Sequence, residues 1–253
     1  MQYLTGVYWN RGSAAAHNQD SLIVQQVLTD RGRVLMAAVC DGMGGLQQGE
    51  TASGYMAERL QEWFYGFLMR AVHKKKPYWM IRRSIERMVY DAQEQLRQYG
   101  RKEQLALGTT MSMLVLWENT YLIWHLGDSR IYHIYRTNRH SRKLIQKGGR
   151  QIEAECMTED HVRGRNQLTK CVGSFGYYRP DHRIGTAKAW EVFLLCSDGF
   201  YHCVTDQELA DILSPEQLRE EAQMERRLKE IGDACMKRGE TDNLSAVCIK
   251  LIR

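Results

Sequence analysis

The stretch AAVCDGMGGLQQGE, residues 37–50, joins an apolar run to an acid and a group of glycines. The apolar run is typical of a β-strand, and the residues after the glycines repeat with the period of a helix. The glycines predict a turn between strand and helix, because glycine adopts positive φ angles without strain. The question for the whole chain is whether Asp41 only ends the strand or also binds a ligand.

Two nucleotide-binding motifs are excluded by the residues in this stretch. A phosphate-binding P-loop requires Lys followed by Ser or Thr after its glycines, whereas LQQ follows at 46–48. The dinucleotide fingerprint G-x-G-x-x-G does not match the spacing of the glycines between positions 42 and 49. Taken alone, an aspartate in such a turn needs no functional explanation.

The composition is that of an ordinary globular protein. The 253 residues are 43% hydrophobic and 26% charged, which predicts one packed domain over residues 1–253. The net charge of +5 is dispersed, and the basic clusters at 73–77 and 136–143 lack interleaved aromatic residues, so we expect no nucleic-acid partner. No signal segment opens the chain and no apolar run reaches the roughly 20 residues that cross a bilayer. We therefore expect a cytoplasmic protein without a membrane partner.

The cysteines indicate a reducing compartment. There are seven, an odd number, and no C-x-x-C spacing occurs, which disfavours both a disulfide framework and a zinc knuckle. Cys40, Cys196 and Cys248 lie within apolar runs, where thiols usually serve as small core side chains. Free thiols of this kind are typical of intracellular proteins.

Seven short segments rich in β-branched and aromatic residues are predicted to be strands. They are residues 21–28, 34–40, 109–117, 120–126, 129–136, 191–197 and 243–251. Two connections, 118–119 and 127–128, have only two residues, and connections this short join antiparallel neighbours. We therefore expect antiparallel sheets, with a hairpin at both places.

Two segments have helical period, 50–72 and 77–99, and the first places one apolar stripe along its length: Ala52, Met56, Leu60, Phe64 and Leu68. A third helix is predicted over 214–239, with Ser214 as the N-cap and Pro215 at the first helical position. Antiparallel strands interrupted by helix pairs predict an α+β layered fold, in which helices cover the sheets.

Acidic residues recur at the edges of the predicted strands: Asp20, Asp41, Asp128, Asp198 and Asp242. Each one alone is explained by a turn or a cap. If these edges face one cleft, the carboxylates converge, and two of them about 4 Å apart repel by roughly 4 kcal/mol at an effective dielectric constant of 20. Protons, arginines or divalent cations could compensate such a cluster, and sites made only of oxygen ligands suit magnesium or manganese.

Nine short motifs follow one another along nearly the whole chain. They are NQD (18–20), DGMGG (41–45), GETAS (49–53), LGTT (107–110), GDSRIY (127–132), DH (160–161), LTKCVG (168–173), CSDG (196–199) and TDN (241–243). In this order they resemble the motifs of the metal-dependent serine/threonine protein phosphatases, the type 2C-like or PPM family. The methionine at position 43 is similar to the residue of bacterial members, whereas eukaryotic members carry a histidine there.

This resemblance implies a fold and an activity. The family fold is a four-layer α-β-β-α sandwich of two antiparallel sheets flanked by helix pairs. The implied activity is the hydrolysis of phosphoserine and phosphothreonine in proteins by water activated between two Mn²⁺ or Mg²⁺ ions, with Asp20 orienting that water. Phosphorylated proteins and a cognate serine/threonine kinase in a signalling pathway are the implied partners.

The resemblance also implies which residues hold the ions. Asp41 would bridge both ions, and the carbonyl oxygen of Gly42 would bind the second. Asp198 and Asp242 would hold the first ion. Asp128, together with Asp198, would hold the weaker third ion that bacterial-type members bind.

Three positions depart from the family pattern. Ala15 stands where the family usually carries an arginine that grips the substrate phosphate, and Arg11 is our candidate for that contact. Met43 cannot donate a proton, so the leaving alkoxide needs another acid. Only the residues 162–167 occupy the place of the mobile flap of bacterial members, which predicts an open site.

These departures keep a second function open, namely a degenerate phosphatase domain that binds a phosphorylated or regulatory partner without turnover. The retention of the acids argues against it: Asp41, Asp128, Asp198 and Asp242 are all present. A site freed from catalysis has no physical need for four carboxylates that repel one another.

Overall fold

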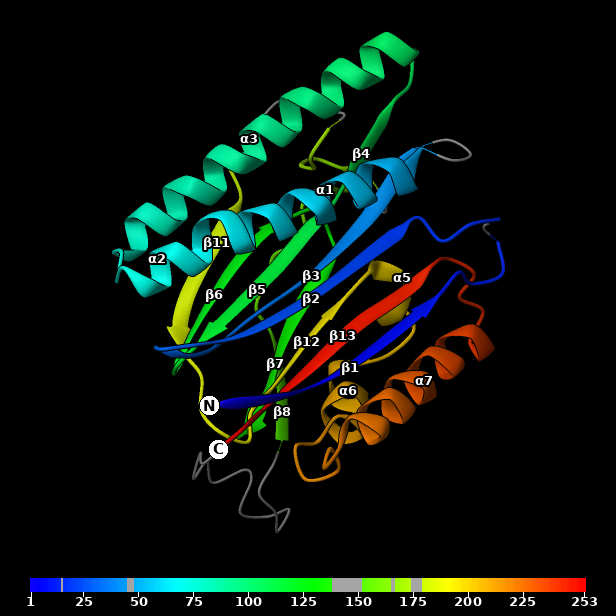
Figure 1. Ribbon diagram of the computed structural model, residues 1–253. Coiled ribbons are helices and arrows are strands. Elements are labelled where there is room, and N and C mark those ends of the chain that lie inside the picture. The colour runs from blue at the N-terminus through cyan, green and yellow to red at the C-terminus, as the bar shows by residue number, and fades with distance from the viewer. Residues whose placement is uncertain (15, 45–47, 138–151, 165–166, 174–178) are drawn as a thin grey trace.

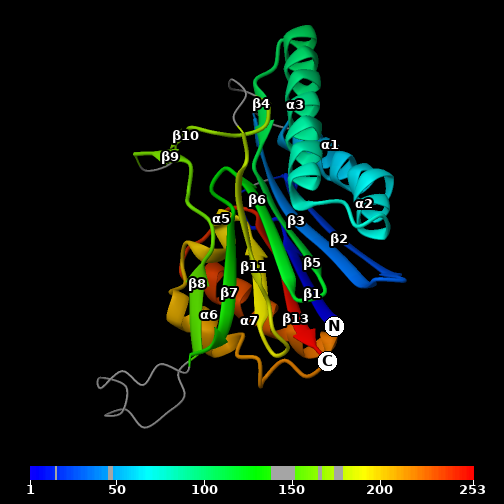
Figure 2. The same ribbon diagram turned by 90° about the vertical axis from the view of Figure 1, so that its left-hand side faces the viewer.

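The computed structural model describes residues 1–253 except 15, 45–47, 138–151, 165–166 and 174–178. Two antiparallel sheets pack face to face, and helices cover the outer face of each sheet (Figure 1, Figure 2). The order of layers is helices, sheet, sheet, helices, which confirms the predicted α+β sandwich. Ala15 and most of the basic cluster 136–143 lie outside the described residues.

Each sheet combines strands that are distant in sequence. The first sheet has the order β1-β13-β12-β7-β8, formed by Gln2–Asn10, Leu244–Ile252, Val192–Cys196, Arg130–Arg136 and Ile152–Cys156. The second sheet has the order β11-β6-β5-β3-β2, formed by Asp181–Thr186, Thr120–Leu126, Met111–Trp117, Gly32–Gly44 and Asp20–Thr29. The short strand β4 (Leu107–Thr109) pairs with the end of β3, and β9 (Val162–Arg163) pairs with β10 (Gln167–Leu168).

The helices divide between the two outer faces. The second sheet is covered by α1 (Gly49–Trp63), the π-helical turn η1 (Phe64–Leu68), α2 (Met69–His73) and α3 (Tyr78–Glu103). The first sheet is covered by α6 (Asp206–Ile212) and α7 (Glu221–Lys237), and the short α5 (Asp198–Tyr201) follows β12. Among the described residues, no helix is both long and apolar enough to span a membrane.

Apolar side chains fill the space between each pair of layers. The predicted stripe is buried against the second sheet, as expected: Ala52, Met56, Leu60, Phe64 and Leu68. Leu35 and Phe193 meet between the two sheets, and Leu228 packs on the outer face of the first sheet. All seven cysteines are free, and Cys40, Cys196 and Cys248 are fully buried, which confirms their predicted place in the core.

The sequence analysis did not predict three of the longer strands, β1, β8 and β11, nor the short strands β4, β9 and β10. Strand β1 contains Gly6, where an added Cβ would lie 2.6 Å from Cβ of Met224, so the glycine allows α7 to approach the sheet. Strand β11 is exposed along most of its length, and β8 is only half-buried. None of the three carries the buried apolar pattern from which the other strands were predicted.

One of the two predicted hairpins is wrong. The connection 118–119 does form a hairpin, with Trp117 opposite Thr120. The connection 127–128 does not, because β6 belongs to the second sheet and β7 to the first. The short length is explained by a crossing between sheets, which carries residue 128 into the space where the two sheets meet.

The third predicted helix begins later than expected. Helix α7 starts at Glu221, and Ser214 lies in a turn in which its carbonyl accepts from the N–H of Gln217 at 2.9 Å. Ser214 is therefore not an N-cap. Helix α6 was not predicted, although Thr205 and Glu208 form a capping box that the spacing T-x-x-E indicates.

Candidate metal centre

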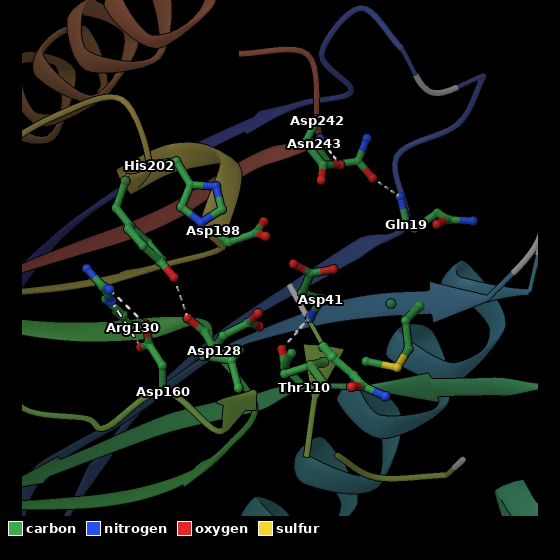
Figure 3. A pocket seen from close by; sticks show the side chains of 16 residues that line it. Gln19, Asp41, Thr110, Asp128, Arg130, Asp160, Asp198, His202, Asp242 and Asn243 are labelled. Carbon is green, nitrogen blue, oxygen red and sulfur yellow. Dashed lines mark hydrogen bonds and ion pairs between the residues drawn. The ribbon is translucent and has the colours of Figure 1, made fainter. Parts of the chain in front are cut away.

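One pocket, of about 650 Å³, lies where the ends of both sheets meet, and it collects most of the predicted site residues (Figure 3). Four of the five predicted aspartates line it together with Gly42: Asp41, Asp128, Asp198 and Asp242. Asp20 does not line the pocket but lies on β2 directly opposite Asp41 on β3. The structure thus brings together acids that are up to about two hundred residues apart.

Each acid reaches the pocket from the end of a different element. Asp41 is near the end of β3, and Asp198 begins α5 just after β12. Asp242 precedes β13, and Asp128 sits in the crossing from β6 to β7. Gly127 makes that crossing possible, since its φ of 112° is one that other residues rarely adopt.

The backbone of Asp41 is fixed by two neighbouring threonines. Its N–H donates to Oγ1 of Thr110 at 2.8 Å, and its carbonyl accepts from the N–H of Thr110 at 2.9 Å and from Oγ1 of Thr109 at 3.0 Å. These bonds leave the side chain directed into the pocket (Figure 3). Thr110 is a site residue that sequence reasoning missed, although it ends the quoted LGTT motif.

Gly42 is a glycine because the chain packs tightly around it. An added Cβ would lie 2.1 Å from the carbonyl oxygen of Gly49 and 2.6 Å from that of Gln19. Its φ is not positive, so the predicted reason, a turn that requires a positive φ angle, is wrong. β3 continues through this position to Gly44. A Cβ added at Gly49 would lie 2.5 Å from the Gly42 carbonyl oxygen, so Gly49 must also lack a side chain here.

Asp20 is a buried acid without good hydrogen bonds. It is 4% exposed, and neither carboxylate oxygen has a hydrogen-bond partner among the described residues. The hydroxyls of Ser197 and Ser245 lie nearby and favour the charged form, but burial outweighs them and raises the pKa of Asp20 to about 7. A carboxyl of this kind can retain its proton near neutral pH.

The acids of the pocket also raise one another's pKa values. Burial, and then the charges of Asp20 and Asp198, raise the pKa of Asp41 well above its usual range. Burial and Asp198 raise the pKa of Asp128 to about 6, and burial and Asp242 raise that of Asp198. Concentrated negative charge in a partly buried pocket therefore opposes ionisation unless a cation binds.

The donor set fits hard divalent cations. Arg130 also lines the pocket, but Asp160 already binds its guanidinium at 3.0 and 2.8 Å. Among the described residues, no three His, Cys, Asp or Glu side chains close around a single point. An open set of carboxylates and carbonyls suits Mg²⁺ or Mn²⁺, because these ions retain several water ligands and need few from the protein.

Arg11, the predicted phosphate contact, is not in the pocket. Its side chain is exposed and donates to the carbonyl of Ala16 at 3.3 Å. Its backbone carbonyl accepts from Nδ2 of Asn243 at 2.8 Å, while Oδ1 of Asn243 accepts from the N–H of Gln19 at 2.7 Å. Asn243, the last residue of the TDN motif, thus holds the backbone of Arg11 and of Gln19 next to Asp242.

The short flap segment lines the pocket, whereas His161 lies behind the pocket wall. The hairpin of β9 and β10 lines the pocket through Val162, Gln167 and Leu168, so even this short segment forms part of the wall. His161 does not line the pocket; its Nδ1 accepts from the N–H of Gly127 at 3.0 Å, and this bond supports the Asp128 crossing. His161 thus holds the loop that carries Asp128.

The chain was also compared with known proteins. The family model described as Protein phosphatase 2C matches residues 11–247. Protein phosphatase PhpP of Streptococcus pneumoniae is 26% identical over 211 residues, which cover 80% of this chain and 81% of the relative. A serine/threonine phosphatase, stp, of Listeria monocytogenes is 26% identical over 217 residues, which cover 81% of this chain and 80% of the relative.

Solved structures share the fold. The Streptococcus agalactiae serine/threonine phosphatase superposes with a TM-score of 0.75 at 19% identity and covers 99% of this chain and 100% of its own. The catalytic domain of the phosphatase PstP, solved in complex with two manganese ions, has a TM-score of 0.73 at 22% identity, with 99% of both chains covered. The match of the family model to nearly the whole chain confirms the resemblance found from the motifs. This chain belongs to the protein phosphatase 2C family.

Proposed function

We propose that this protein phosphatase hydrolyses phosphoserine and phosphothreonine in proteins with the help of two Mn²⁺ or Mg²⁺ ions. The observation that carries the proposal is the pocket itself, in which four carboxylates converge while Arg130 on its wall is bound to a fifth, that of Asp160. Such an arrangement is costly for the folded protein unless cations occupy it. Family membership and the two manganese ions of PstP support the same conclusion.

The ion ligands follow the roles expected from the sequence. Asp41 and the carbonyl of Gly42 would hold one ion, and Asp41, Asp198 and Asp242 the other, with Asp128 and Asp198 at a weaker third site. Ions so placed would lower the pKa of a bound water and neutralise the phosphate. The fixed backbone of Asp41 and the packed Gly42 support this assignment, since both keep the ligand oxygens in position.

Other residues near the site would assist the reacting water or limit the access of bulk water. Asp20 lies behind Asp41, and its carboxyl, with a pKa of about 7, would accept or release a proton close to the reacting water. Val162 and Leu168 of the flap hairpin would limit the access of bulk water from one side. The substrates would be phosphoproteins, which a cognate serine/threonine kinase would supply.

Hydrolysis of a phosphothreonine peptide tests the proposal. We expect Mn²⁺-dependent release of phosphate from the wild-type protein and a loss on the order of 10³-fold for Asp41→Asn, because a ligand shared by both ions is removed. Asp181→Asn is the matched control, since Asp181 lies outside the pocket on β11 and its loss should change the rate little. Phosphopeptide binding without any phosphate release would instead support the degenerate domain.

A further inference from the structure

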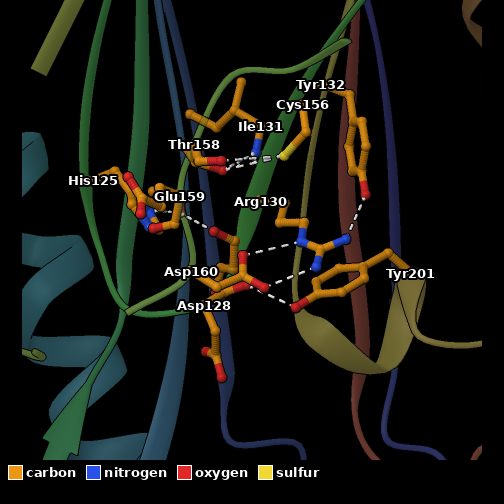
Figure 4. Close-up of polar contacts among 12 residues, drawn as sticks. His125, Asp128, Arg130, Ile131, Tyr132, Cys156, Thr158, Glu159, Asp160 and Tyr201 are labelled. Atoms are coloured by element: carbon orange, nitrogen blue, oxygen red, sulfur yellow. Dashed lines mark hydrogen bonds and ion pairs between the residues drawn. The ribbon is translucent and has the colours of Figure 1, made fainter. Parts of the chain in front are cut away.

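An arginine-centred cluster forms part of the pocket wall (Figure 4). Arg130 binds Asp160 through two hydrogen bonds, and its guanidinium lies over the ring of Tyr201, 3.9 Å from the centroid. Nη1 of Arg130 also donates to the hydroxyl of Tyr132 at 3.0 Å. The cluster therefore joins β7, the segment before β9 and helix α5 into one rigid contact.

Tyr201 extends this cluster to one of the pocket acids. Its hydroxyl donates to the backbone carbonyl of Asp128 at 3.0 Å, and its side chain is almost fully buried. Burial raises the pKa of the Tyr201 phenol, so the hydroxyl keeps the proton that it donates. Tyr201 is also the last residue of α5, the helix that begins with Asp198.

The connection that carries Asp128 depends on a few contacts. The carbonyl of Gly127 accepts from the N–H of His161 at 2.8 Å, and Ser129 meets Thr110 through their hydroxyls at 2.7 Å. Both contacts are made by the neighbours of Asp128. The hydroxyl of Tyr201 makes a side-chain contact with the Asp128 peptide itself, and it comes from α5, the helix that follows β12.

From this geometry we infer that Tyr201 is a positioning residue that sets the place of Asp128 relative to Asp198. The inference rests on the proposed function, in which these two acids hold the weaker ion. Tyr201 does not touch the ion. It joins the Asp128 peptide to the helix that carries Asp198, and Arg130 and Asp160 hold the ring in place. The two acids then face the same space before any ion arrives.

Tyr132 provides a matched control. Tyr201→Phe and Tyr132→Phe each remove one buried phenolic hydroxyl from the Arg130 cluster, but only the first breaks a contact with Asp128. Mn²⁺ binding to the full chain is measured by isothermal titration calorimetry, so the result does not depend on turnover. We expect Tyr201→Phe to weaken the weakest-bound ion about three- to tenfold, the equivalent of one hydrogen bond, and Tyr132→Phe to weaken it less than about twofold.

The same pair of variants is then made in Asp128→Asn. If Tyr201 acts through Asp128, its substitution should have no further effect on ion affinity in that background. Equal weakening by the two phenylalanine variants, or a Tyr201→Phe effect that persists in full in Asp128→Asn, would overturn the inference and leave the proposed function intact. A wild-type protein that binds no Mn²⁺ would instead remove the proposed function, and this inference with it.

Discussion

Two groups of acids lie at or next to the pocket, and they differ in whether a basic residue pairs with them. Asp160 on the pocket wall and Asp181 outside the pocket each have a cation: Arg130 contacts Asp160 at 2.8 Å, and Lys170 contacts Asp181 at 3.3 Å. The other four acids of the pocket have no such partner among the described side chains: Asp41, Asp128, Asp198 and Asp242. Basic residues are therefore available locally, but Arg130 and Lys170 pair with Asp160 and Asp181 and not with these four acids.

The pKa values record this difference. Burial alone would raise the pKa of Asp181, but its hydrogen bond with His161 and the charge of Lys170 lower it instead. Within the pocket, burial and neighbouring carboxylates raise the pKa values of Asp41, Asp128 and Asp198. The paired acids stabilise the fold, whereas the unpaired acids reduce its stability as long as no cation is bound.

Substitution should separate the two groups by the sign of its effect on stability. Asp160→Asn leaves the half-buried Arg130 without its anion and should lower the free energy of unfolding by about 2 kcal/mol. Asp41→Asn removes a buried, repelled charge and should raise it by about 1 kcal/mol in metal-free protein, even though activity is lost. Urea denaturation in EDTA measures both values. Effects of the same sign would contradict the comparison.

The pH dependence of metal-free stability should come from the unpaired group. The pKa values of Asp20 and Asp128, about 7 and about 6, exceed their ordinary values, so protonation favours the folded state. Their stabilising contribution is fully present below about pH 4 and is lost as the pH rises through 6 to 7. Between about pH 5.5 and about pH 8, the free energy of unfolding in EDTA should fall by about 2 kcal/mol.

Two controls sharpen this pH experiment. Saturating Mn²⁺ should abolish the fall, because the ions bind the charged carboxylates and release their protons. Asp20→Asn should reduce the fall in EDTA, since burial raises the pKa of Asp20 to about 7. An unchanged fall in that variant would show that other groups are responsible.

Arg11 provides the smallest expected effect. Because its guanidinium is exposed and contacts Ala16 outside the pocket, Arg11→Ala should change kcat/KM for a phosphopeptide by less than about twofold. Steady-state kinetics at saturating Mn²⁺ measure this directly. A tenfold rise in KM would restore the original prediction that Arg11 grips the substrate phosphate.

Buried elements were predictable from the sequence, and exposed ones were not. Strands β3, β5 and β12 are apolar along most of their length, so their composition alone revealed them. Strand β11 has no buried side to produce a pattern. The crossing at Gly127 was mistaken for a hairpin because a two-residue connection has the same length in both cases, and only the pairing of the whole chain separates them.

The acids of the site were predictable because each ends or follows a strand, whereas their surroundings were not. Asp41, Asp128, Asp198 and Asp242 meet at one pocket, as expected from their positions. Thr110 and Tyr201 act through backbone contacts with Asp41 and Asp128, which no local pattern reveals. The GDSRIY motif contains Arg130, but its pairing with Asp160 depends on a segment thirty residues away.

The central claim is that the unpaired carboxylates exist to hold divalent cations, and anomalous X-ray scattering from crystals soaked in Mn²⁺ tests it most directly. We expect at least two manganese peaks in the pocket, one beside Asp41 and the Gly42 carbonyl and one bounded by Asp41, Asp198 and Asp242. A pocket without manganese peaks, or one in which a lysine or arginine side chain has moved in among the acids, would contradict it.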